Sequence, residues 1–226
     1  MDTLQTIWRG LDWSVPVELL LRVLPALLCI TLHEMAHGYA ALLMGDTTAK
    51  ARGRLSLNPL HHIDWMGLVM MVAFRFGWAK PVPINMYRFK NPKRGMALTA
   101  LAGPVCNFLL ACLMLLLFGV SAALSGSSGG LLPRLLVTTA YLSLSLGIFN
   151  LLPVPPLDGS KVLFSLLSDN AYEKLMRYER YGMLLLVALL STGVLSNPLS
   201  AAVSRVFDAL IVLAERSFAL TVRIFR

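Results

Sequence analysis

The sequence predicts an all-α integral membrane protein, a polytopic bundle of about four to six transmembrane helices with a re-entrant or hairpin segment. Hydrophobic residues make up 57% of the 226 residues and charged residues only 14%, a balance that a soluble domain with a wetted surface does not show. Several apolar stretches are long enough to cross a hydrocarbon core of about 30 Å as helices. We expect a single domain over residues 1–226 that keeps its first helix, because no cleavable signal precedes that helix.

The first expected helix, residues 17–44, contains the stretch "TLHEMAHGYA". Its 28 residues span about 42 Å at roughly 1.5 Å each, so His33, Glu34 and His37 lie within the depth of the membrane. Ionisable side chains there cost roughly 2.5 to 3.5 kcal/mol each and persist where they face a cavity or a partner. This helix is therefore expected to carry a functional site.

The connection over residues 45–94 is expected to be cytoplasmic and partly re-entrant. Its apolar run, residues 65–76, is too short to span as a helix. Exposed backbone groups cannot stay unpaired in lipid, so we expect a re-entrant segment or a strand hairpin packed against the protein.

Further helices are expected at 95–124, at 131–159 with a break at "PVPPLDG", and at 181–196, a short fourth crossing. The prolines end the third helix because proline cannot continue its hydrogen bonds. Residues 199–226 gather charged side chains on one arc of a helix, which suits an interfacial helix lying on the membrane. Those side chains are Arg205, Asp208, Glu215, Arg216, Arg223 and Arg226. A last transmembrane helix with this polar stripe against the bundle is the alternative.

Lysine and arginine predict the orientation. Nine of them lie in the 45–95 connection and four in residues 160–180, whereas the turn over 125–133 has none. By the positive-inside rule the first two segments are cytoplasmic and the turn is external. The histidines then lie nearer the cytoplasmic side, and the net charge of +8 needs no nucleic acid to explain it.

The histidines of "HEMAH" stand at i and i+4, so they share one helical face with Cβ atoms about 6 Å apart and can bind one metal ion. Glu34 lies beside that face, where it can reach a metal-bound water without being a ligand. Such a glutamate takes the proton of the water, while zinc polarises the substrate carbonyl and lowers the pKa of the water. The pattern favours a Zn²⁺ cofactor and peptide-bond hydrolysis. The alternative, ordinary polar histidines, leaves three ionisable groups uncompensated in lipid.

A catalytic zinc has three protein ligands and one open position, so a third ligand is needed. The acidic candidates downstream are Asp46, Asp64, Asp158 and Asp169. Only Asp158 follows a break in a membrane helix, in "NLLPVPPLDG", on the same side as His37, and Gly159 beside it permits close backbone approach. We therefore expect Asp158 to complete the coordination with His33 and His37.

The motifs "HEMAHGYAA" and "NLLPVPPLDG" resemble those of the site-2 proteases, which are intramembrane zinc metalloproteases. The likeness is to the compact prokaryotic type without a PDZ or nucleotide-sensing domain. It extends to "GRLSLNPLHHID", "GWAKPVPIN" and "GPVCN", and so covers most of the chain. One departure, tryptophan where relatives usually have proline after Asp64, predicts a different turn there.

The resemblance implies that His33, His37 and Asp158 bind zinc and that Glu34 is the catalytic base. It also implies that Asn107 and Asn150 hold the substrate or stabilise the oxyanion, a role for which an amide donor is suited.

The predicted function is that of an intramembrane zinc metalloendopeptidase in the lipid bilayer of a prokaryotic cell membrane. Its substrates would be transmembrane proteins or signal-peptide remnants, unwound in part because an intact helix hides its carbonyls. Residues 65–85 would either pair with an extended substrate or plug the cavity. A catalytically silent adaptor and a metal transporter are the alternatives. Intact Glu34 speaks against the adaptor, and the lack of further intramembrane carboxylates speaks against the transporter.

Overall fold

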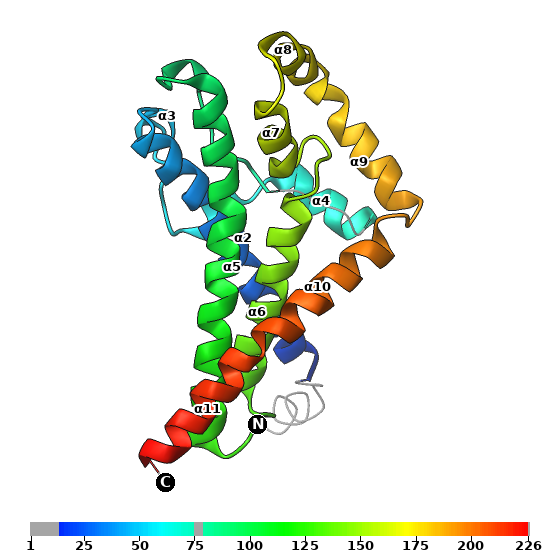
Figure 1. Ribbon diagram of the computed structural model, residues 1–226. Helices are drawn as coiled ribbons and strands as arrows, with labels where there is room; N and C mark the ends of the chain where they lie inside the picture. The colour runs from blue at the N-terminus through cyan, green and yellow to red at the C-terminus, as the bar shows by residue number, and fades with distance from the viewer. Residues whose placement is uncertain (1–13, 75–78, 226) are drawn as a thin grey trace, which may run out of the picture.

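The computed structural model describes residues 14–74 and 79–225, and there the chain forms a helical bundle (Figure 1). Its long helices are α2 (Ser14–Leu43), α5 (Pro92–Ser125), α6 (Leu131–Asn150) and the consecutive α10 (Ser196–Leu210) and α11 (Val212–Phe225). By length and composition, α2, α5, α6 and the α10–α11 pair supply four stretches that could cross a membrane. The prediction of an all-α polytopic membrane protein is confirmed.

Helix α5 lies at the centre of the bundle, in contact with α2, α6 and α11. It begins after Asn91, whose side chain accepts the backbone N–H of Arg94 (3.2 Å). Pro92 occupies its first turn, where the missing backbone donor is not needed. Gly126 ends the helix in the left-handed conformation (φ 68°), which glycine adopts at little cost. The turn that follows lies at the same end of the bundle as the C-terminus (Figure 1).

After the break that follows α6, helix α7 (Asp158–Ser165) lies at the other end of the bundle (Figure 1). Gly159 packs so closely on the end of α6 that a Cβ atom there would overlap the carbonyl oxygen of Leu151. The close approach expected at Gly159 is therefore present, and it sets the position of the first residue of α7.

Residues 44–74 and 79–91 form short helices and loops. The helices are α3 (Thr48–Ala51), η1 (Pro59–His62), α4 (Trp65–Phe74) and η2 (Met86–Arg88). The apolar run expected to be re-entrant forms α4, whose ten residues reach about 15 Å, too short to cross. The alternative prediction is a strand hairpin. The described ranges contain one isolated β-bridge, between Ile63 and Ala79. The last two residues of the run, 75–76, lie outside those ranges.

Asp46 connects the non-helical residues 79–85 to the end of α2 through hydrogen bonds. Its side chain is fully buried, and its carboxylate accepts the backbone N–H groups of Asn85 (2.6 Å) and Thr48 (2.9 Å). Burial alone would raise the pKa of Asp46, but these hydrogen bonds and the charge of Arg88 hold that pKa below its usual range. The carboxylate thus stays ionised and fixes the segment that runs beside α2.

The next elements, α8 (Asp169–Tyr178), η3 (Glu179–Tyr181) and α9 (Gly182–Ser191), extend away from the bundle (Figure 1). The fourth crossing expected at 181–196 corresponds to α9, which has ten residues and is not among the four stretches long enough to span. Its side chains are largely exposed, with Leu184 at 72%.

Helices α10 and α11 return to the bundle and pack along α6 and α5. Val203 is buried with Ala111 and Leu144, and Ala214 is buried with Leu115 and Ala140. This placement corresponds to the alternative of a last transmembrane helix. The charged stripe, however, faces away from the bundle, because its described members are all exposed. They are Arg205, Asp208, Glu215, Arg216 and Arg223; Arg226 lies outside the described residues.

Candidate metal centre

Two buried histidines face each other on the last turns of α2. His33 and His37 are 5% and 6% exposed, and the i, i+4 spacing puts both rings on the helical face that packs against α5. Their Nε2 atoms are 3.0 Å apart, and the rings meet edge to face with centroids 4.6 Å apart. Both side chains therefore direct the same nitrogen to one point.

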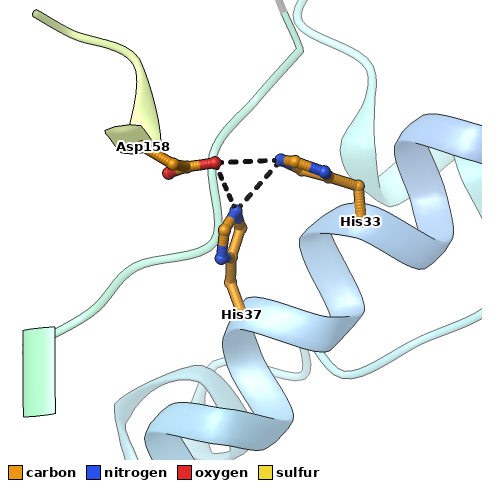
Figure 2. Close-up of side chains that lie close together, drawn as sticks. All are labelled: His33, His37 and Asp158. Carbon is orange, nitrogen blue, oxygen red and sulfur yellow. Dashed lines mark hydrogen bonds and ion pairs between the residues drawn. The ribbon is translucent and has the colours of Figure 1, made fainter. Parts of the chain in front are cut away.

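Asp158, the first residue of α7, completes the group (Figure 2). Its Oδ2 lies 3.2 Å from Nε2 of His33 and 3.1 Å from Nε2 of His37. Within the described ranges, these three residues are the cluster of histidine, cysteine and acidic side chains whose atoms converge closely enough to share a metal ion. The structure thus brings together the three residues expected as ligands, from two helices distant in the sequence.

The size of this triangle fits zinc. Tetrahedral zinc with bonds of about 2.0 to 2.2 Å keeps its ligand atoms about 3.3 to 3.6 Å apart. The three edges here, 3.0, 3.1 and 3.2 Å, are only slightly shorter. Two imidazoles and one carboxylate also form a donor set that catalytic zinc sites use, with the fourth position left for water.

The ring of His37 is held from behind by α5. Its Nδ1 lies 2.7 Å from the backbone carbonyl oxygen of Thr99, which can only accept, so Nδ1 carries the proton. In the neutral ring this leaves the lone pair on Nε2, the atom that faces His33 and Asp158. The hydrogen bond thereby leaves Nε2 of His37 able to bind a metal ion.

Gly103 lets α5 pass directly against both imidazoles. A Cβ atom at this position would lie 2.5 Å from Cε1 and Nε2 of His37 and 2.6 Å from Cε1 of His33. Real Cβ contacts are never this short, so only glycine fits while both rings keep their places.

Asp158 is buried, at 8% exposure, yet it is held as a carboxylate. Burial alone would raise its pKa, but the imidazoles of His33 and His37 and the charge of Lys161 hold that pKa well below its usual range. The Nζ atom of Lys161, one turn further along α7, lies 3.9 Å from Oδ1 of Asp158 and 4.0 Å from Oε1 of Glu179. The oxygen turned away from the histidines thus faces a positive charge.

Glu34 is half-buried beside the ligand face of α2. Its Oε2 accepts the backbone N–H of Val82 at 2.8 Å, so the non-helical residues 79–85 run next to this carboxylate. It is not a member of the converging group, in keeping with a role other than that of a ligand.

The two asparagines expected at the site have different surroundings. Asn107 is fully buried, and its Nδ2 lies 3.2 Å from Nδ1 of His33. Asn150 is half-buried at the end of α6, where its Nδ2 donates to the carbonyl of Leu146 in the same helix (3.0 Å). Of the two asparagines, only Asn107 forms a hydrogen bond with one of the three converging residues within the described ranges.

Sequence reasoning missed the groups that hold the ligands. The Thr99 carbonyl and the Val82 N–H are backbone atoms, and nothing in the sequence marks which backbone atom meets a side chain. Gly103 could have been noticed, because it opens the "GPVCN" motif. Lys161 could also have been noticed, because it stands at i+3 from Asp158 on one helical face.

Comparisons with known proteins give matches to one peptidase family and to relatives named as zinc metalloproteases. The profile of Peptidase family M50 matches residues 120–192, which include the break and Asp158. YwhC of Bacillus subtilis is 37% identical over 176 residues, 75% of this chain and 80% of the relative. Rip2 of Mycolicibacterium smegmatis is 29% identical over 175 residues, 76% of this chain and 66% of the relative.

A third relative, MJ0392 of Methanocaldococcus jannaschii, is 30% identical over 141 residues, 62% of this chain and 32% of the relative. All three relatives carry the words zinc metalloprotease in their names. No solved structure matches the chain.

Proposed function

This chain belongs to peptidase family M50, the site-2 protease family of zinc metalloproteases, and from this premise we propose that it cleaves other membrane proteins within or next to their transmembrane segments. The observation that carries the proposal is the depth of the donor set. His33 and His37 belong to a helical stretch long and apolar enough to span a membrane, and they converge with Asp158 in the interior of the bundle. In this proposal the cleaved peptide bonds belong to membrane-embedded segments, which reach the same depth as the donor set.

We assign His33, His37 and Asp158 as the zinc ligands and Glu34 as the general base. Bound there, zinc supplies the Lewis acidity that activates water and polarises a carbonyl. Glu34 follows His33 directly on α2, beside the helical face that carries the two histidines. In this role it takes a proton from the attacking water and passes it to the leaving amine.

The surroundings of Glu34 support an unwound substrate. The non-helical residues 79–85 are held next to it by the Val82 bond to Glu34 and the Asn85 bond to Asp46. An extended peptide entering there exposes the carbonyls that an intact helix would hide. Asn150 remains our assignment for holding the substrate or stabilising the oxyanion, since amide N–H groups can donate to developing negative charge. Asn107, expected in the same role, meets Nδ1 of His33 at 3.2 Å, on the side of that ring away from the donor set.

We further propose a prokaryotic cell membrane as the location, with the site nearer the cytoplasm. His37 lies six residues before the end of α2 at Leu43 and Asp158 is the first residue of α7, and the end of the bundle that carries α3 and α7 is opposite the turn between α5 and α6 (Figure 1). The loops at the α3 end hold the excess of lysine and arginine, which favours the cytoplasmic side. The substrates are membrane proteins or signal-peptide remnants reached through the bilayer.

The variant Glu34→Gln tests the role of the base. An amide cannot take a proton from water, so this variant should keep about one zinc per chain and lose proteolysis. Membrane segments that accumulate in cells carrying this variant identify substrates, and the purified protein is then assayed on one of them. Undiminished cleavage by purified Glu34→Gln protein would remove Glu34 from the mechanism.

Asp158→Ala is the companion variant, and it should lose both zinc and cleavage. Asp169→Ala is its matched control, because Asp169 is an exposed aspartate that pairs with Lys93 (2.9 Å) at the start of a neighbouring helix. Asp64→Ala should likewise keep the metal. If Asp158→Ala kept its zinc and Asp64→Ala lost it, the third ligand would come from the loop before α4 instead.

A further inference from the structure

The amide of Asn107 meets His33 on the side of the ring that faces away from the donor set. The Nδ2 of Asn107 lies 3.2 Å from Nδ1 of His33, and both side chains are buried. The other end of the amide, Oδ1, is buried without a hydrogen-bond partner in the described ranges. A buried carbonyl oxygen left unpaired costs about 1 to 3 kcal/mol, so this arrangement calls for an explanation.

The position of Asn107 itself is fixed. Its backbone oxygen accepts the hydroxyl of Ser143 on α6 (2.9 Å). Gly147, one turn later on α6, packs against the Asn107 side chain, since a Cβ atom at Gly147 would lie 3.3 Å from Cβ of Asn107. The freedom that remains is rotation of the planar amide, whose two ends have nearly the same shape.

The chemistry of a zinc ligand decides which end should face His33. A neutral imidazole binds metal through the nitrogen without a proton, so a ring that presents Nε2 to the metal carries its proton on Nδ1. That N–H needs an acceptor, and Nδ2 of an amide is only a donor. Two N–H groups would then face each other across 3.2 Å.

We propose that Asn107 is a positioning residue for His33, and that in the zinc-bound protein its amide is turned so that Oδ1 accepts the Nδ1–H of His33. The inference rests on the proposed role of His33 as a ligand. It gives His33 the same kind of support that His37 receives from the carbonyl of Thr99, at 2.7 Å from Nδ1. One histidine is oriented by a backbone acceptor and the other by a side-chain acceptor, and only the second can be removed by substitution.

Three variants of the full-length protein, purified in detergent, test this role through zinc affinity, measured by competition with a fluorescent zinc chelator. Asn107→Leu keeps the side-chain volume and removes the acceptor, and it should weaken zinc binding about 10-fold to 100-fold. Asn107→Asp keeps an acceptor, and it should bind zinc within about threefold of the wild type or more tightly. Asn170→Leu is the control and should not change zinc affinity, because Asn170 is exposed on α8.

The order of zinc affinities among the variants distinguishes a positioning role of Asn107 from a packing role. If Asn107 only filled space in the core, leucine would be tolerated and a buried aspartate would be harmful, the reverse of the order expected here. Asn107→Leu binding zinc as well as or better than Asn107→Asp would overturn the proposal. If Asn107→Leu fails to fold, Asn107→Ala replaces it, with the thermal midpoint of the metal-free protein as the folding control. Because zinc affinity is the readout, the result does not depend on proteolysis, so a failure of the proposed function would be recognised separately.

Discussion

The two halves of the bundle pack in different ways. Around the donor set, helices approach so closely that Gly103 and Gly159 have no room for a Cβ atom, and polar atoms of α2 bond to α5, α7 and the non-helical residues before α5. Beyond α7, the chain exposes large apolar side chains, Leu184 of α9 at 72% and Leu220 of α11 at 58% among them. A metal site needs side chains held within about 0.5 Å, whereas a lipid-facing helix needs only to be apolar. Close packing itself occurs in both halves, since a Cβ atom at Gly119 would also overlap a backbone carbonyl oxygen of α11. The difference lies in the polar contacts, because the hydrogen bonds that hydroxyl groups of α10 and α11 make in the described ranges stay within their own helices.

The largest effect is expected from Gly103→Ala, at the point where α5 packs directly against both imidazoles. The added methyl group would collide with both imidazoles and displace the ligands, so zinc affinity should fall at least about tenfold and cleavage should be lost. The measurements are chelator competition and proteolysis by the purified protein. Gly129→Ala is the matched control, because a Cβ atom there would have its nearest neighbour at 3.7 Å. Normal zinc affinity in Gly103→Ala would mean that the helices can separate without harm to the site.

A smaller effect is expected from leucine truncation, and its size should differ between the halves. Leu144 on α6 is fully buried against Ala111 and Val203, so Leu144→Ala should lower the free energy of unfolding by about 2 to 5 kcal/mol. Leu184 on α9 is largely exposed, and Leu184→Ala should change the same quantity by about 0.5 kcal/mol or less. Denaturation of both variants in the same detergent gives the comparison. Equal losses would show that α9 is packed against a surface not seen in the single chain.

The smallest effect on function is expected from single cysteine substitutions in α10 and α11. These cysteines serve as probes of water access. They are placed in a protein whose three native cysteines are replaced by alanine. If this helix pair spans the membrane, Arg223→Cys, near the end that bears the α5–α6 turn, should react with a membrane-impermeant maleimide added from outside. Asp208→Cys, 15 residues earlier and about 22 Å along the helix, should not react. Labelling along the whole charged stripe would instead place the pair on the membrane surface.

The helical class and the donor set could be predicted because each rests on a local pattern. An apolar run of membrane length has few alternatives to a helix, and the spacing of His33 and His37 fixes their common face without knowledge of the rest of the chain. Asp158 could be chosen because prolines break the helix before it, and the structure brings it to the histidines. These inferences needed only short stretches of sequence together with the hydrocarbon thickness.

What the sequence did not reveal depends on contacts between distant segments. Residues 181–196 are apolar enough to suggest a crossing, but the helix there ends at Ser191 and the chain turns at Gly193, whose φ is 69°. The bond from Val82 to Glu34 and that from Asn107 to His33 join residues 48 and 74 positions apart. Such pairs depend on how the helices pack against each other. The hydrophobic periodicity of the sequence does not determine that packing.

The distance between the ligands along the chain also bears on biosynthesis. His33 and Asp158 are 125 residues apart, and a ribosome that adds about 5 to 20 residues per second needs roughly 6 to 25 seconds to travel from one to the other. During that interval the newly made chain holds both histidines but lacks Asp158, and α5, which contacts both rings, is synthesised and inserted. A chain that stalls before α7 therefore lacks one of the three proposed zinc ligands. The order of the helices delays completion of the donor set until α7 has been made.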